Sequence, residues 1–135
     1  MELTDARPTK PAIRMTDEEA DLVADLAVRI EQSSPELSAL LMEEIDRAEI
    51  VAADALPDNT VRLGSRVEFR NESTGQTREV RLVLPGQADI GQGDISILTF
   101  AGAGLIGLTE GQSISWPDAN GVERALTVTK VTPPA

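Results

Sequence analysis

Residues 16–48 read TDEEADLVADLAVRIEQSSPELSALLMEEIDRA, two runs of apolar residues at helical spacing that a short polar segment separates. The first run follows Thr16, which makes a Thr-x-x-Glu capping pattern with Glu19, so we expect a helix over residues 17–32. Pro35 suits the first position of a second helix after a Ser34 cap. The apolar stripes consist of Leu22, Val23, Leu26, Ala27 and Ile30 in the first helix and Leu37, Leu40, Leu41, Ile45, Ala48 and Ala52 in the second. One stripe per helix and a short loop predict an antiparallel hairpin, a short coiled coil, over residues 15–56.

The period changes from helical to two after Leu56-Pro57-Asp58-Asn59. Strands are expected over 61–70, 77–84, 95–99, 113–116 and 125–131, with turn residues between them. Connections this short favour an antiparallel sheet. The predicted fold class is α+β, with a loose tail over residues 1–14, the hairpin over 15–56 and a small β domain over 57–135.

Charge is distributed unevenly along the chain, whose formal net charge is −11. Residues 15–56 hold 12 acidic and 2 basic residues, whereas residues 57–135 hold 9 acidic and 7 basic residues. Binding to a nucleic-acid backbone relies on Lys and Arg, so direct, sequence-specific nucleic-acid binding is not expected. An acidic half suits a basic protein surface, although acidic residues also serve solubility alone.

Residue types that are absent or rare narrow the possible chemistry. The chain has no Cys and no His, which removes thiol nucleophiles and the usual ligands of structural zinc. No cofactor and no resident metal are expected. Its only aromatic residues are Phe69, Phe100 and Trp116, too few to favour an aromatic-lined ligand pocket, so we expect Phe100 and Trp116 to serve packing. No signal peptide or membrane-spanning run is evident, which predicts a cytoplasmic protein that does not bind membranes.

Gly102, Gly104 and Gly107 match the G-x-G-x-x-G pattern of dinucleotide sites. Such a site requires a long helix and a further parallel strand, but Thr109-Glu110-Gly111 follows within a few residues. We therefore expect a tight connection from a strand to a short helix, in which glycine permits close backbone approach.

Arg62, Arg66 and Arg70 are expected on one strand face with Glu68, opposite Glu79 and Arg81 of the next strand. This pattern indicates either a basic patch or, as we favour, a solvated face with ion pairs across the strands.

Two carboxylates, Glu31 and Glu36, flank the turn of the hairpin. They could hold a divalent metal together with ligands from another protein, but two carboxylates alone are more typical of a solvated loop.

The order and spacing of several short motifs resemble the bacterial Gre transcript-cleavage factors and their relative Rnk, the regulator of nucleoside diphosphate kinase. The motifs are Leu63-Gly-Ser-Arg-Val-Glu-Phe69, Asp94-Ile-Ser-Ile97, Gly104-Leu-Ile-Gly-Leu108, Gly111 and Leu126-Thr-Val-Thr-Lys-Val131, with Leu41-Met-Glu-Glu-Ile-Asp-Arg-Ala48 and Leu56-Pro57-Asp58 upstream. The resemblance implies an FKBP-like β domain with one short helix and, as partner, bacterial RNA polymerase. In this family the β domain docks at the rim of the polymerase secondary channel and the hairpin enters that channel.

The resemblance also assigns expected sites. The docking loop corresponds to Thr99, Phe100 and Ala101, where family members commonly have proline at the position of Phe100. The hairpin tip corresponds to Glu31, Gln32, Ser33, Ser34 and Glu36. In Gre factors, acidic tip residues help to place a second metal at the polymerase's active site, but their hairpins are about twice as long as the roughly 24 Å expected for residues 17–32.

A non-enzymatic, Rnk-like regulator that occupies the channel without cleavage therefore fits best. The alternatives are a Gre-type cleavage factor acting through Glu31 or Glu36, and a peptidyl-prolyl isomerase suggested by the FKBP-like fold alone.

Overall fold

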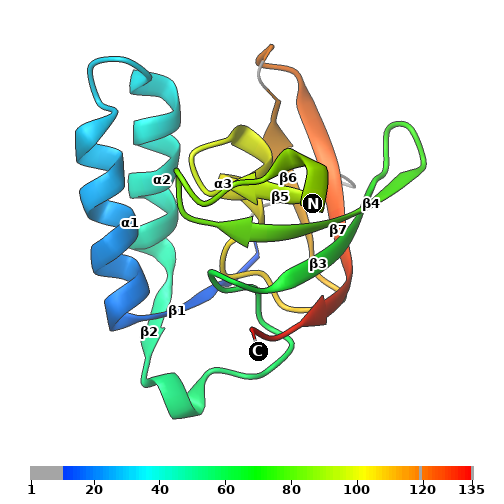
Figure 1. Ribbon diagram of the computed structural model, residues 1–135, viewed down its shortest axis with the longest axis horizontal. Coiled ribbons are helices and arrows are strands. Elements are labelled where there is room, and N and C mark those ends of the chain that lie inside the picture. The colour runs from blue at the N-terminus through cyan, green and yellow to red at the C-terminus, as the bar shows by residue number, and fades with distance from the viewer. Residues whose placement is uncertain (1–10, 119, 135) are drawn as a thin grey trace, which may run out of the picture.

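The computed structural model describes residues 11–118 and 120–134, with a two-helix hairpin beside a curled five-stranded sheet (Figure 1). α1 (Asp17–Arg29) and α2 (Pro35–Arg47) are antiparallel, which confirms the predicted hairpin. Thr16 caps α1, because its side-chain oxygen accepts a hydrogen bond from the backbone N–H of Glu19 at 3.1 Å. α1 ends at Arg29 and not at residue 32 as expected, since the chain turns at Ile30.

A parallel two-stranded ribbon of β1 (Arg14–Thr16) and β2 (Glu49–Val51) closes the base of the hairpin. The expectation that α2 continues through Ala48 and Ala52 is wrong, because Ala48 is already extended, at φ −74° and ψ 143°. The expectation of a loose tail is also wrong for residues 11–14, since Ile13 is buried and Arg14 belongs to β1. Residues 1–10 lie outside the described part of the chain.

The large sheet has the strand order β5-β4-β3-β7-β6. Its strands are β3 (Arg66–Asn71), β4 (Gln76–Val83), β5 (Asp94–Ser96), β6 (Ser113–Pro117) and β7 (Glu123–Thr132). The antiparallel pairing that was predicted holds for β3–β4, β3–β7 and β6–β7, but β5 pairs with β4 in parallel, so the sheet is mixed. The connection through η2 (Ile90–Gln92) carries the chain across to make this parallel pairing possible.

The first strand of the β domain, β3, starts at Arg66 and not at residue 61 as expected. η1 (Ala53–Ala55) precedes a segment in which Val61 is paired outside the sheet, since its N–H donates to Leu108 O at 2.7 Å and its carbonyl accepts from Gly107 N at 2.9 Å. These contacts are made by residues far apart in sequence, so strand alternation alone does not reveal them.

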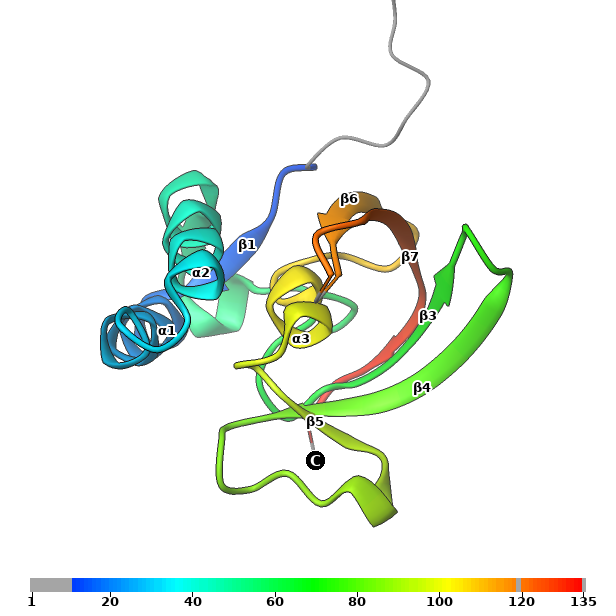
Figure 2. The same cartoon turned by 90° about the horizontal axis from the view of Figure 1, so that it is seen from above.

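α3 (Phe100–Leu105) lies within the curl of the sheet, as Figure 2 shows from above. A Cβ at Gly102 would overlap the carbonyl oxygen of Ser96, and one at Gly104 would lie 2.7 Å from Cδ1 of Trp116. The glycines therefore permit close packing of a short helix, as predicted, and the crossover helix of a dinucleotide site does not follow them.

One continuous buried cluster joins the hairpin to the sheet. It includes Val23 and Leu41 from the hairpin, Ile106 that follows α3, and Val67 and Val128 from the sheet. Burial of these aliphatic side chains is the main stabilising contribution to the packing of the hairpin on the β domain. Within residues 11–118 and 120–134, no helix has the length and apolar character needed to cross a membrane.

Candidate functional site

The tip of the hairpin is a tight, exposed turn. The backbone N–H of Ser34 donates to Ile30 O at 2.7 Å, and Pro35 then begins α2. Glu31 and Glu36 are exposed on either side of this turn. In the described part of the chain, no group of three or more acidic side chains is arranged to hold a metal ion. The tip therefore presents two separate carboxylates to solvent.

A buried hydrogen bond braces the hairpin just behind its tip. Ser38 Oγ of α2 donates to Ala27 O of α1 at 2.7 Å. Ala27 O lies in the last turn of α1, where carbonyls lack a helical partner, because Glu31 N donates to Val28 O instead. The bond satisfies that carbonyl and holds the two helices in close contact.

The expected docking loop forms the N-terminus of α3. Thr99 caps the helix, since its Oγ1 accepts from Gly102 N at 3.0 Å and donates to Ser96 O at 2.8 Å. The carbonyl of Phe100 accepts a 2.6 Å hydrogen bond from Trp116 Nε1. Thr99 is exposed, whereas Phe100 and Ala101 are half-buried. The loop is thus partly apolar and is held in place by hydrogen bonds at Thr99 and Phe100.

The structure brings Glu36 of the expected hairpin tip and Phe100 of the expected docking loop to one groove. This groove, of about 440 Å³, is lined by Glu36 and Leu40 of α2, by Phe100, and by the β6–β7 turn at Asn120 and Gly121. Figure 1 shows the hairpin alongside the β domain, with its tip at the same end as the β6–β7 turn. Glu36, in the first turn of α2, therefore lies close to the expected docking loop, while the α1–α2 turn extends further toward the top of Figure 1 than α3 does.

Most of the hairpin's negative charge faces solvent. Ten of its twelve acidic residues are exposed, the exceptions being Glu19 and Glu44. Glu44 is buried and accepts two hydrogen bonds from Arg47, at 2.9 and 2.7 Å. Arg47 also donates to the carbonyl of Pro11, which ties the N-terminal segment to α2.

Glu19 joins the hairpin to the β domain. Its Oε2 accepts a hydrogen bond from Leu63 N at 3.0 Å and lies 3.6 Å from Arg62 Nε. Its Oε1 is buried and has no hydrogen-bond partner among residues 11–118 and 120–134. Burial raises the pKa of Glu19 above its usual range, against the opposing effects of the Leu63 N–H and the Arg62 charge.

In the described part of the chain, the arginines of the sheet do not form the expected ion pairs between β3 and β4. Arg66 lies directly opposite Arg81, and Glu68 opposite Glu79. Arg81 instead pairs with Asp94 of β5 through two hydrogen bonds of 2.9 and 3.0 Å. This guanidinium lowers the pKa of the Asp94 carboxyl. The pairing follows from the parallel β5, which the sequence did not indicate.

The three aromatic side chains of the protein border one cavity, and Trp116 and Phe100 also pack in or against the buried core, as expected. The cavity has a volume of about 560 Å³ and is bordered by Phe69, Phe100 and Trp116, by Leu126, and by polar residues that include Arg78 and Arg124. The rings come from β3, α3 and β6, so only the curl of the sheet around α3 brings them together.

A sequence family described as "Transcription elongation factor, GreA/GreB, C-term" matches residues 56–133, which contain the whole curled sheet and α3. The chain belongs to the GreA/GreB family. The resemblance seen in the sequence is thereby confirmed.

Similarity to individual GreA/GreB-family proteins extends into the hairpin. The chain is 32% identical over 120 residues to the regulator of nucleoside diphosphate kinase of Escherichia coli strain K12, covering 89% of this chain and 88% of that protein. It is 29% identical over 124 residues to the transcription elongation factor GreA of Syntrophobacter fumaroxidans, covering 86% and 80%. The solved prokaryotic transcription elongation factor GreA/GreB from Nitrosomonas europaea superposes with a TM-score of 0.69 at 31% identity, covering 91% of this chain and 99% of that one.

The sequence patterns did not indicate several residues that organise the candidate site. Glu19 was interpreted only as a capping residue, and Ser38 and Arg78 were not singled out. The one available signal was a Ser within an apolar helix face, at Ser38, which indicates a buried hydroxyl in need of an acceptor.

Proposed function

We propose that this protein binds bacterial RNA polymerase as a non-enzymatic regulator, with the loop Thr99–Phe100–Ala101 docking at the rim of the secondary channel and the hairpin at its mouth. Membership of the GreA/GreB family supports polymerase as the partner. The exposed acidic residues of the hairpin support a basic channel lining as the surface that it meets.

The observation that carries the non-cleaving part of the proposal is the shared groove of Glu36 and Phe100. α1 has 13 residues, so it is about 20 Å long at 1.5 Å per residue. A hairpin of this length, with Glu36 beside the docking loop, has little reach beyond the channel rim. Glu31 and Glu36 would then act by occupancy and charge, without assisting transcript cleavage.

Competition with a Gre factor for RNA polymerase tests the binding. Core polymerase carrying a fluorescently labelled GreA is titrated with this protein at low salt, and displacement of the label is expected. Phe100→Ala should raise the protein concentration needed for half-displacement by about tenfold, because it removes the apolar anchor of the loop. Val122→Ser, a change at an exposed apolar residue on the nearby β6–β7 turn, is the matched control and should compete as the unaltered protein does. Absence of displacement at saturating protein would contradict the proposal.

A stalled elongation complex separates the non-cleaving regulator from its alternative, a cleavage-stimulating factor that acts through Glu31 or Glu36. With saturating protein and Mg²⁺, we expect the transcript to remain intact. We also expect that added GreA no longer binds the polymerase. Transcript shortening that disappears in a Glu31→Gln, Glu36→Gln double variant would support the alternative. A double variant at Asp21 and Asp25, exposed residues elsewhere on the hairpin, controls for loss of charge.

A further inference from the structure

The cavity that gathers all three aromatic residues has the dimensions of a small-molecule site. Its volume of about 560 Å³ lies within the range of roughly 300–1,000 Å³ that is typical of ligand pockets. One side is apolar, formed by Phe69, Phe100, Trp116 and Leu126. Trp116 Nε1 donates to Phe100 O and the side chain is only 1% exposed, so the indole forms a buried apolar floor of the cavity and offers it no hydrogen-bond donor.

Among the residues that the structure describes, the charged groups of the cavity leave one net positive charge. Its charged lining residues are Arg78, Arg124 and Asp118. Arg124 Nε donates to Asp118 Oδ2 at 3.1 Å, and that carboxylate also accepts from the backbone N–H groups of Asn120 and Val122 at 2.9 and 3.0 Å. Asp118 and Arg124 therefore offset each other's charge and hold the β6–β7 turn.

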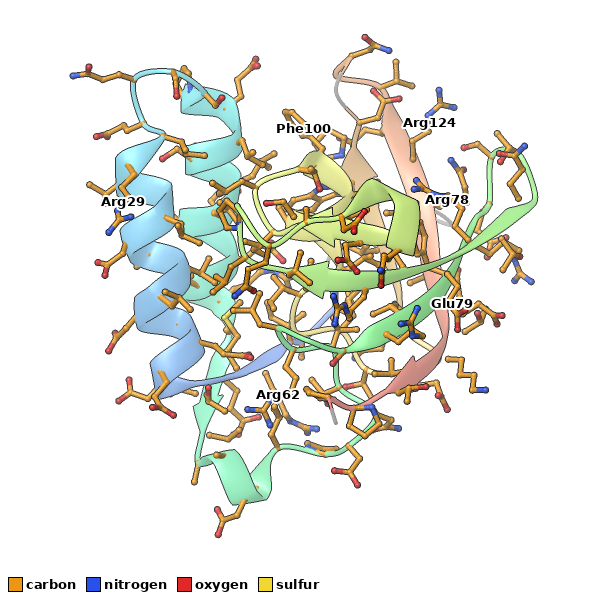
Figure 3. All side chains as sticks on the ribbon, viewed as in Figure 1. Arg29, Arg62, Arg78, Glu79, Phe100 and Arg124 are labelled. Atoms are coloured by element: carbon orange, nitrogen blue, oxygen red, sulfur yellow. The ribbon has the colours of Figure 1, made fainter. Side chains whose placement is uncertain are left out.

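Arg78 is the cation of this group without a carboxylate partner in the described part of the chain. It lies opposite Phe69 in the β3–β4 register, with its guanidinium carbon 5.8 Å from the centroid of the Phe69 ring. Figure 3 labels Arg78 and Arg124 on the sheet side of the cavity and Phe100 on the α3 side. A guanidinium held over a ring keeps its in-plane N–H groups available to a bidentate anion.

We propose that this cavity binds a small organic carboxylate, whose ring or short apolar chain contacts Phe69, Phe100 and Trp116 and whose carboxylate pairs with Arg78. A positive charge beside an apolar wall selects this ligand class, in a protein whose net charge of −11 otherwise repels anions. Binding of this kind is independent of polymerase and is tested on the isolated protein.

Trp116 provides the readout, because it is the only tryptophan and its indole N–H gives a single NMR signal. The protein is titrated at neutral pH with phenylacetate, with its neutral analogue phenylacetamide, and with acetate, which lacks the ring. Phenylacetate should shift the indole signal at millimolar concentrations, and phenylacetamide should bind about tenfold more weakly because it cannot form the charge-assisted pair. Acetate should leave the signal unchanged.

Variants connect the binding to Arg78. Arg78→Gln should weaken the binding of phenylacetate by about tenfold and leave the binding of phenylacetamide unaffected, because only the charged pair is lost. Arg29→Gln removes the same charge from the exposed face of α1, and its phenylacetate affinity should equal that of the unaltered protein (Figure 3). The proposal is overturned if phenylacetate causes no shift, if the acid and the amide bind equally, or if Arg78→Gln and Arg29→Gln have the same effect.

Discussion

The carboxylate of Glu19, in the first turn of α1, accepts a hydrogen bond from the backbone N–H of Leu63 at 3.0 Å. In a capping box the glutamate would turn back to its own helix start. Here the cap is made by Thr16 alone, and the Glu19 carboxylate reaches the segment before β3. Glu19 thereby fixes the hairpin to the β domain, at the cost of burying a charged group.

The Glu19 carboxylate is expected to make the stability of the protein depend on pH. Burial raises its folded-state pKa, so the folded protein binds this proton more tightly than the unfolded chain does. The stabilising contribution is complete below the unfolded pKa of about 4.3 and is lost as the pH rises through the folded-state pKa. Glu19→Gln stays neutral and keeps an oxygen for Leu63 N. Its free energy of unfolding should therefore rise relative to that of the unaltered protein across this window.

Urea unfolding between pH 4 and pH 8 measures that difference. Glu18→Gln, at the exposed neighbouring position, removes the same charge without changing a buried group. Its free energy of unfolding should depend on pH in the same way as that of the unaltered protein. Equal pH dependence for all three proteins would show that Glu19 is not buried in the way described.

Ser38→Ala should destabilise the hairpin. The change removes the donor to Ala27 O and leaves that buried carbonyl unsatisfied, with an expected loss of about 1–3 kcal/mol in the free energy of unfolding. Ser33→Ala, at an exposed hydroxyl with a longer 3.4 Å contact to Ile30 O, should change stability by less than about 0.5 kcal/mol. Chemical denaturation of both variants is the measurement, and similar losses would argue against the buried bond.

Gly104→Ala should destabilise the protein although alanine favours helices by about 1 kcal/mol over glycine. The new Cβ would lie 2.7–2.9 Å from three atoms of the Trp116 ring, so α3 or the indole must move, at an expected cost of about 1–3 kcal/mol. The strain should also change the near-UV circular dichroism of Trp116. Gly91→Ala, where the nearest atom is an exposed side-chain oxygen at 3.3 Å, should be tolerated. Unchanged stability and spectrum for Gly104→Ala would contradict the packing of α3.

Local interactions explain why the sequence predicted α1, α2 and β3 correctly. The capping oxygen of Thr16, the ring of Pro35 and the 3.6-residue apolar period act within a few residues, so α1 and α2 could be located before any tertiary contact was known. The alternation of Val67 and Phe69 with charged residues likewise located β3. The order of motifs along the chain indicated the family, which the match over residues 56–133 confirms.

Only the tertiary structure decided which distant residues meet. In the sequence pattern, the aromatic residues are separate apolar positions: Phe69, Phe100 and Trp116. Only the curl of the sheet brings them to the wall of one cavity. The parallel pairing of β5 determines the partner of Arg81, and the packing of the hairpin places Glu36 beside Phe100. Propensity and period depend on near neighbours along the chain, whereas cavities, buried charges and shared grooves depend on contacts whose sequence separation leaves no local pattern.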